Sequence, residues 1–303
     1  MMMSRLTTTP SKLPKILKLS TRDRCFELGR RTMVMGVLNL TPDSFSRDGR
    51  LSSAKNDPVK NCDYALRMVE QGADIVDIGG ESTRPDARPV MESEELKRIM
   101  PTLLRLRKKS KVVISIDTTK TEVARRALDA GADMVNNVKG TRATDRFLEI
   151  VARYEAAYVV MHSRGTPKTM QSMTAYKDLT GEIIAELKLS LEKCLDRGIK
   201  SDKIIVDPGV GFAKTAQQNF LLLKQLKKFQ CLKRPILVGT SRKSFIGKLF
   251  KADASHRMWA TAATVAAAIC HGAHIIRVHD VKEMKQVALV TDAILQPSLA
   301  DSL

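Results

Sequence analysis

Residues 112–138 read VVISIDTTKTEVARRALDAGADMVNNV, and this stretch decides the fold. A continuously apolar run ends at Asp117, and a helical pattern follows from Lys120 to Ala130, with apolar residues spaced three and four apart. Gly131 then precedes a second apolar run, as expected where glycine terminates a helix. Runs that are apolar at every position are typical of strands buried on both faces in a parallel sheet. The stretch therefore predicts a strand–helix–strand unit.

The same unit repeats along the whole chain. We expect strands at Met33–Leu40, Asp74–Gly79, Val112–Asp117, Met134–Val138, Ala157–His162, Ile204–Asp207, Ile236–Gly239 and Ile275–His279. Helical patterns follow at Pro58–Gln71, Ser93–Lys108, Lys120–Ala130, Thr144–Tyr154, Tyr176–Arg197, Thr215–Lys228, Arg257–His271 and Val281–Leu295. Eight such units over about 265 residues match a (β/α)8 TIM barrel of the α/β class. An open doubly wound sheet is the alternative, but its GxGxxG fingerprint is missing after the first strand.

No linker rich in Pro, Gly or Ser divides the 303 residues, so we expect a single domain. The barrel should span residues 31–297, followed by a C-terminal tail at 298–303. Met1–Ser20 holds four basic and no acidic residues and lacks the apolar region of a signal peptide. We therefore expect residues 1–30 to be a disordered or loosely docked N-terminal extension.

The net charge of +18 favours polyanionic partners in general, nucleic acid among them. Its distribution favours a simpler interpretation, because the basic stretches Leu96–Ile116 and Lys224–Arg234 lie in expected helices or the loops that follow them. RNA recognition also uses aromatic side chains interleaved with charge, and only 4% of this chain is aromatic. We interpret the charge as a solvated outer face and expect no nucleic-acid partner, although a basic nucleic-acid-binding barrel stays as a remote alternative.

Cysteine spacing and hydropathy indicate the cellular compartment of the protein. The five cysteines are scattered, odd in number and without CxxC spacing, which argues against a zinc site or a disulfide framework. No apolar run approaches the roughly 20 residues of a membrane helix. We expect a cytoplasmic protein with no membrane partner.

Polar residues appear at the carboxyl end of every expected strand. A single aspartate there would usually be a helix cap or a turn residue, but eight strand ends of a barrel face one shared mouth. We therefore predict an active site at this mouth. The residues in question include Asn39, Asp77, Asp117, Asn136, His162, Asp207, Lys243, Arg277 and His279.

The residue types indicate two kinds of ligand. Lys243, Arg277 and His279 cluster at the last two strand ends, where barrels commonly bind phosphate, and suit a polyanion such as a diphosphate. Buried carboxylates need partners, and an Asp–Asn–Lys set suits the amidine-like edge of a pterin or a purine. No triad order or metal-ligand spacing stands out, and we find no covalent nucleophile.

Six ordered motifs between Met33 and about Ala293 resemble the dihydropteroate synthase family. They are 35–46 (MGVLNLTPDSFS), 77–85 (DIGGESTRP), 115–118 (SIDT), 207–212 (DPGVGF), 241–244 (SRKS) and 277–280 (RVHD). Members of this family are (β/α)8 barrels, usually homodimers. They join 6-hydroxymethyl-7,8-dihydropterin diphosphate to p-aminobenzoate, which gives 7,8-dihydropteroate and pyrophosphate in folate biosynthesis.

The resemblance implies roles for individual residues. The pterin would be held by Asp77, Asp117, Asn136, Asp207 and Lys243. The diphosphate would be held by Asn39, Arg84, Arg277 and His279, with Asn39 also reaching a Mg²⁺ cofactor. The p-aminobenzoate pocket would be formed by Thr83, Arg84, Pro85, Phe212, Lys243 and Ser244. The residues nearest the chemistry would be Asp117, Lys243, Arg277 and His279, and mobile loops would carry Asp43, Ser44 and Phe45.

The implied mechanism is early loss of pyrophosphate followed by attack of the aniline on a cationic pterin. Several positions depart from the usual family pattern: Arg47, Asn137, Ser163-Arg164 and Ala213. The 81–85 loop is intact, so we expect sulfonamide sensitivity. The closest competitor is a pterin-dependent methyltransferase serving a corrinoid protein, which should lack the Ser-Thr-Arg-Pro and Ser-Arg-Lys-Ser motifs present here.

Overall fold

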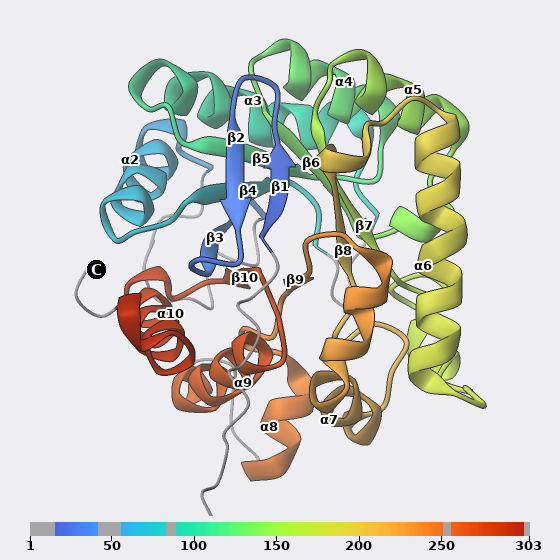
Figure 1. Cartoon of the computed structure of the whole chain (residues 1–303). Helices are drawn as coiled ribbons and strands as arrows, with labels where there is room; N and C mark the ends of the chain where they lie inside the picture. Colours follow the sequence, from blue (N-terminus) through green and yellow to red (C-terminus); the bar gives the residue numbers. More distant parts are fainter. Residues whose placement is uncertain (1–15, 42–55, 83–88, 251–255, 300–303) are drawn as a thin grey trace, which may run out of the picture.

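The computed structural model describes residues 16–41, 56–82, 89–250 and 256–299, and these form a closed barrel (Figure 1). Eight parallel strands follow the order β8-β7-β6-β5-β4-β3-β10-β9. A parallel bridge between Val206 and Ile236 joins the two ends of that order. Helices surround the strands, so the expected (β/α)8 architecture is confirmed.

The elements lie close to their expected positions. The strands are β3 (Met33–Asn39), β4 (Ile75–Gly79), β5 (Val113–Asp117), β6 (Met134–Asn137), β7 (Ala157–Met161), β8 (Ile204–Asp207), β9 (Leu237–Val238) and β10 (Ile275–Val278). The main helices are α2 (Pro58–Glu70), α3 (Glu92–Lys109), α4 (Thr121–Asp129), α5 (Asp145–Arg153), α6 (Leu179–Asp196), α7 (Ala216–Lys224), α8 (Ser244–Phe250), α9 (Met258–Cys270) and α10 (Val281–Leu295). Short 3-10 turns are η1 (Gly140–Arg142), η2 (Met170–Ser172), η3 (Ser201–Lys203), η4 (Leu226–Leu232) and η6 (Pro297–Leu299).

Two helix boundaries differ from expectation by more than two residues, and one helix is additional. Helix α6 begins at Leu179 and not at Tyr176, because Asp178 accepts a hydrogen bond from Gly181 N and caps the helix. The helix expected to end at Lys228 stops at Lys224 and continues as η4. The short helix α8 was not expected at all.

Side chains alternate between the barrel interior and the helix layer along each strand. Ile75 and Val113 belong to an inner cluster, whereas Val76 and Ile114 pack in the cluster between sheet and helices. The period of two then carries the later residues Asp77 and Asp117 to the interior as well. This alternation brings the polar strand-end residues to a single mouth.

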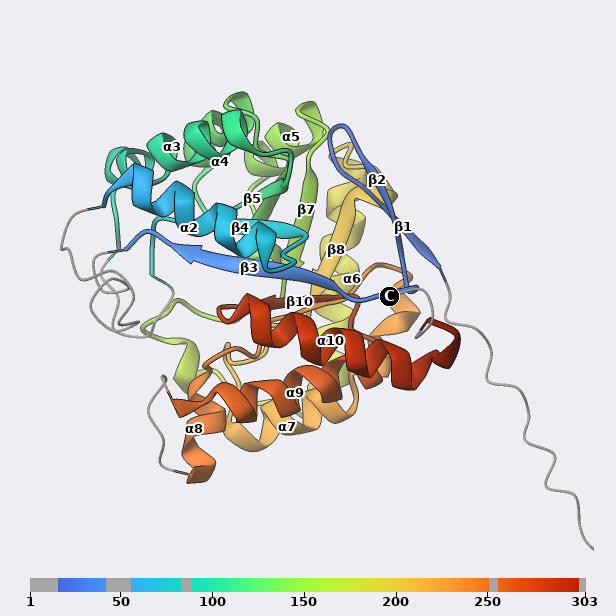
Figure 2. The ribbon, with the colours of Figure 1, turned by 90° about the vertical axis from the view of Figure 1, so that its left-hand side faces the viewer.

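Residues 17–28 correct one expectation. We expected residues 1–30 to be disordered or loosely docked, and this expectation is wrong for residues 17–28. Strands β1 (Leu17–Ser20) and β2 (Cys25–Leu28) form an antiparallel hairpin. Leu19 and Leu28 are buried against the inner cluster. The hairpin lies at the opposite end of the barrel from the tip of β3 (Figure 2) and closes that end.

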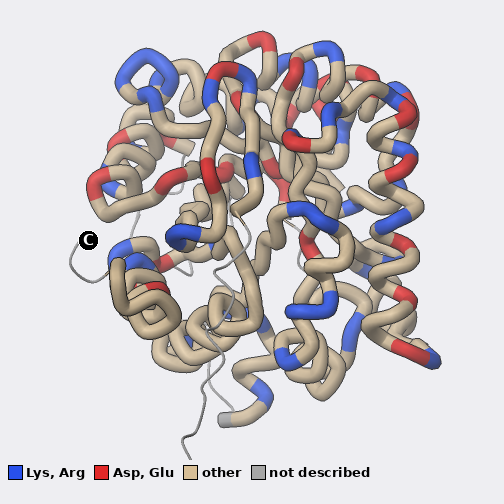
Figure 3. Tube along the Cα trace, viewed as in Figure 1, with Lys and Arg blue, Asp and Glu red and all other residues tan. Residues whose placement is uncertain are grey.

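Charges are spread over the outer helices, with lysine and arginine interleaved with aspartate and glutamate (Figure 3). In the basic region of α3, Arg98 pairs with Glu94 and Arg107 pairs with Asp133. This pattern fits the expected solvated face. Among the described residues, no helix has both the length and the apolar character required to cross a membrane.

Candidate active site at the carboxyl ends of the strands

Four of the expected site residues contact one another inside the mouth. Arg277 Nε lies 2.7 Å from Asp77 Oδ2, and Arg277 Nη2 lies 2.8 Å from Asp117 Oδ2. Asn136 Nδ2 donates to the same Asp77 oxygen at 3.0 Å. Strands β4, β5, β6 and β10 each supply one of these side chains. The mouth therefore holds a rigid polar network built on strands.

Carboxylates outnumber the cations that face them. Burial raises the pKa of Asp117, with Arg277 opposing the shift and Asp77 adding to it. Burial also raises the pKa of Asp207, although its Oδ1 accepts a hydrogen bond from Gly209 N at 2.7 Å. Asp77 Oδ1 is buried and has no partner among the described groups. Such a site favours a ligand that brings hydrogen-bond donors or positive charge.

Lys243 stands beside these carboxylates and over an aromatic ring. Its Nζ lies 4.1 Å from the centroid of the Phe212 ring, a cation–π distance. Burial lowers the pKa of Lys243 to about 8, and Arg277 adds to the shift while Asp207 and Asp117 oppose it. Lys243 therefore links the carboxylate side of the mouth to the aromatic side.

The remaining expected residues surround this centre. A Cβ added to Gly79 would lie 3.5 Å from both Asn39 Oδ1 and Asp117 Cβ, so these two side chains flank that glycine. His279 Nδ1 lies 3.0 Å from Ser241 Oγ. Ser244 is exposed at the first residue of α8.

Two expected loops fall outside the described residues. They contain the p-aminobenzoate residues Thr83, Arg84 and Pro85, the loop residues Asp43, Ser44 and Phe45, and the departure at Arg47. Their roles stay predictions.

Sequence reasoning missed an ion-pair cluster at the base of the second loop. Lys120 Nζ lies 2.6 Å from Glu81 Oε2 and also contacts the fully buried Glu95. Glu81 Oε1 in turn accepts a hydrogen bond from Val90 N at 3.0 Å. The cluster fixes both ends of the segment between Ser82 and Val90. Its only sequence signal was Lys120 after two threonines, which also fits a helix cap.

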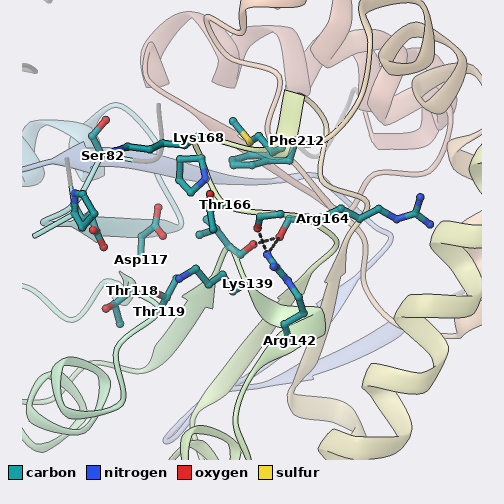
Figure 4. Close-up of a pocket in the computed structure, with 17 residues that line it drawn as sticks. Ser82, Asp117, Thr118, Thr119, Lys139, Arg142, Arg164, Thr166, Lys168 and Phe212 are labelled. Atoms are coloured by element: carbon teal, nitrogen blue, oxygen red, sulfur yellow. Dashed lines mark hydrogen bonds between the residues drawn. The ribbon is translucent and has the colours of Figure 1, made fainter. Parts of the chain in front are cut away.

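A cavity of about 270 Å³ adjoins the network (Figure 4). Asp117 and Phe212 line it on the side of the network, and the loops after β6 and β7 line the other. Arg164 points away from the labelled Asp117 side of this cavity. Its guanidinium pairs with Glu182 and Glu186 and lies 4.0 Å from the centroid of the Tyr176 ring. Arg164 thus braces α6, and both Ser163 and Arg164 line the cavity wall.

Two other departures have local explanations. Asn137 is buried, and its Oδ1 accepts a hydrogen bond from Lys139 N at 2.8 Å, so it stabilises the turn after β6. Ala213 has a φ of 49°, in the left-handed region that favours glycine. Ala213 therefore bears backbone strain that a glycine would avoid.

Comparison with known proteins gives the chain a family. The sequence pattern of the pterin binding enzymes matches residues 35–279. The chain belongs to the pterin-binding enzyme family. The dihydropteroate synthase of Synechocystis sp. is 48% identical over 270 residues, which covers 89% of this chain and 92% of that protein. The Escherichia coli dihydropteroate synthase is 41% identical, and the match covers 86% and 91% of the two chains.

Solved structures of related proteins match this chain in fold and over most of its length. A Yersinia pestis dihydropteroate synthase in complex with a sulfonamide drug superposes with a TM-score of 0.86 at 37% identity, covering 92% of this chain and 99% of that one. A Clostridium difficile dihydropteroate synthase crystallised with pteroic acid gives a TM-score of 0.82 at 42% identity, covering 89% and 98%. The expected membership, the barrel and an enzymatic function are therefore confirmed.

Proposed function

We propose that this enzyme is a dihydropteroate synthase, which joins 6-hydroxymethyl-7,8-dihydropterin diphosphate to p-aminobenzoate and releases pyrophosphate. The observation that carries the proposal is the polar network of Asp77, Asp117, Asn136 and Arg277 inside the mouth. Its donors and acceptors suit the amino-pyrimidinone edge of a pterin. Relatives crystallised with pteroic acid and with 4-aminobenzoate support the choice of both substrates.

The chain's own groups can stabilise the charges of this reaction. The bond between the pterin methylene and the diphosphate oxygen breaks, and its electron pair leaves with pyrophosphate. Arg277 and His279 would bind the developing negative charge, and Arg277 Nη1 has no partner among the described residues to prevent it. Asp117 would stabilise the cationic pterin left behind. The aniline nitrogen then attacks the methylene carbon and loses a proton.

Phe212, Lys243 and Ser244 would form the described part of the p-aminobenzoate pocket. The ring of Phe212 would pack on the substrate's ring, and Lys243, whose Nζ lies 4.1 Å from the centroid of that ring, would contact both substrates. Ser244 would contact the carboxylate, together with Thr83, Arg84 and Pro85. Positioning and charge account for catalysis without a covalent nucleophile.

Asn39 fits the expected Mg²⁺ ion. Its side-chain oxygen is of the type that Mg²⁺ prefers, and it lies beside Asp117 where the diphosphate would be placed. No cluster of three metal-binding side chains occurs among the described residues, which suits an ion held by one protein oxygen, substrate phosphates and water. The bound ion supplies positive charge to the diphosphate oxygens.

An assay with both substrates tests the proposal. We expect Mg²⁺-dependent formation of dihydropteroate and pyrophosphate in equal amounts, with competitive inhibition by a sulfonamide against p-aminobenzoate. Absence of pyrophosphate release would contradict the proposal. Tight, salt-sensitive RNA binding would revive the basic-barrel alternative. Methyl transfer to a corrinoid protein would support the methyltransferase alternative.

We also propose a cytoplasmic homodimer. Large apolar side chains are exposed on helices α8, α9 and α10, and exposed apolar surface of this kind is common at protein interfaces. They are Leu249, Trp259, Val290, Ile294 and Leu295, of which Trp259 is 80% exposed. All five cysteines are free, as suits a reducing compartment. Light scattering should give twice the chain mass of 33.6 kDa, and Trp259→Glu should reduce it to the monomer value.

A further inference from the structure

Lys214 is a buried lysine for which the proposed mechanism has no role. Its side chain is 3% exposed, and it follows the loop that leaves strand β8. Nζ lies 3.0 Å from Gly209 O, 3.0 Å from Phe212 O and 3.1 Å from His162 Nδ1. Burial lowers the pKa of Lys214 to about 7, and in its ammonium form the three protons of Nζ match these three acceptors. None of the three is a carboxylate.

The two carbonyl groups belong to the loop that shapes the active site. Gly209 N donates to Asp207 Oδ1, and the Phe212 ring lies beneath Lys243 Nζ. Inside the loop, Phe212 N donates to Gly209 O at 3.1 Å. Lys214 therefore holds both ends of the 209–212 turn through their carbonyl groups.

The third acceptor connects the turn to the barrel wall. His162 is fully buried at the end of β7, and burial lowers its pKa to about 4, so the ring is neutral near pH 7. Because Nδ1 accepts from Lys214, the ring proton is assigned to Nε2, which lies 3.1 Å from Glu186 Oε2 on α6. A Cβ on Gly209 would lie only 1.9 Å from His162 O, so the turn packs directly on this wall.

We propose that Lys214 is a positioning residue for p-aminobenzoate, because it clamps the 209–212 turn against His162 and so fixes the Phe212 ring beneath Lys243. Lys214 acts through the turn and does not touch the substrate. The inference rests on the synthase activity proposed above.

Loss of the Lys214 hydrogen bonds should weaken the binding of p-aminobenzoate more than the binding of the pterin diphosphate. Most of the pterin contacts would remain, because Asp117 and Asn136 lie on strands β5 and β6. Asp207 also lies on a strand, β8, although its Oδ1 accepts a hydrogen bond from Gly209 N in the turn. The p-aminobenzoate ring would then pack on a Phe212 ring whose position is no longer fixed. In Lys214→Met we therefore expect the KM for p-aminobenzoate to rise about tenfold, the scale expected for lost hydrogen bonds to a charged group. The KM for the pterin diphosphate should change less than about threefold.

Lys203 provides a matched control. It is also buried, at 5% exposure, and its Nζ donates to two backbone carbonyl groups, Thr21 O at 3.0 Å and Glu155 O at 2.7 Å. It lies at the hairpin end of the barrel, far from the turn. Lys203→Met should lower stability as Lys214→Met does, yet leave both KM values unchanged.

The experiment is steady-state kinetics on wild-type, Lys214→Met and Lys203→Met full-length chains, with circular dichroism to measure the folded fraction. An unchanged KM for p-aminobenzoate in Lys214→Met, or an equal rise in Lys203→Met, would overturn the inference. If Lys214→Met does not fold, Lys214→Arg is measured in the same way; a selective rise supports the clamp, and no rise overturns it. Inactive wild-type and Lys203→Met enzymes would instead contradict the proposed function.

Discussion

Arg277 determines the charge balance of the mouth. One guanidinium group serves two carboxylates, Asp77 and Asp117, at 2.7 and 2.8 Å. Since burial raises the pKa of Asp117 in spite of this contact, the site is short of positive charge. A cationic pterin would correct that shortage, which explains why the network suits a reaction that generates one.

The pH dependence of activity should report the protonation state of Lys243. Its ammonium form is present below a pKa of about 8 and is lost above it. We therefore expect kcat/KM for p-aminobenzoate to fall as the pH rises through about 8. Lys243→Arg should retain some activity and move this decline to higher pH, because the guanidinium does not titrate in that range. A pH–rate profile of the two enzymes checks this, and identical profiles would contradict the role of Lys243.

At the scale of single residues, the sequence predicts inward-facing strand residues well and supporting residues poorly. Asp77, Asp117 and Asp207 each follow a buried apolar run, so period-two alternation places them inside. Lys120 and Lys214 lie in loops, and their contacts depend on how the loops pack. No local pattern could assign those contacts.

At the scale of elements, the hairpin of β1 and β2 could not be predicted from the sequence. Each strand offers only two large apolar side chains, for example Leu17 and Leu19, which is too short a pattern to distinguish from a polar extension. The barrel requires the hairpin because its inner cluster would otherwise face water. That requirement cannot be seen in residues 17–28 themselves. The long helices, by contrast, repeat their apolar spacing over several turns and were predicted to within a few residues.

The hairpin should contribute to stability and not to catalysis. Leu19→Ala removes a fully buried side chain and should lower the free energy of unfolding by about 3 kcal/mol. Ile16→Ala is the control, since Ile16 is 47% exposed and its loss should cost less than about 0.5 kcal/mol. Urea unfolding measures both variants. A greatly reduced kcat in folded Leu19→Ala would show that the hairpin does more than close the barrel.

At the scale of the whole molecule, buried histidines should make the fold sensitive to acid. Burial lowers the pKa of both His162 and His274 to about 4, and His274 Nδ1 accepts a hydrogen bond from Ile236 N at 3.1 Å. In the unfolded chain a histidine has a pKa of about 6.5. Between these values the unfolded state binds more protons, so stability falls as the pH decreases from about 6.5 to 4.

His274→Gln isolates one of these groups. Glutamine can still accept from Ile236 N, but it does not titrate. Between pH 7.5 and pH 5 the wild type should lose about 2 kcal/mol more unfolding free energy than the variant. Urea unfolding at the two pH values measures the difference. Equal losses in the two proteins would mean that His274 does not remain neutral in the folded state.

The overall architecture was predictable because eight similar units repeat and their strand ends must converge. The central claim is that the inward-facing polar residues at those ends bind a pterin. Calorimetric titration with pteroic acid tests it most directly, on wild-type protein, Asp207→Asn and the control Asp133→Asn. Asp133 is also a buried carboxylate, but it precedes β6 at the other end of the barrel and pairs with Arg107. We predict that Asp207→Asn weakens binding by about 10- to 100-fold and that Asp133→Asn leaves it unchanged. Equal affinity of wild-type and Asp207→Asn proteins would contradict the account.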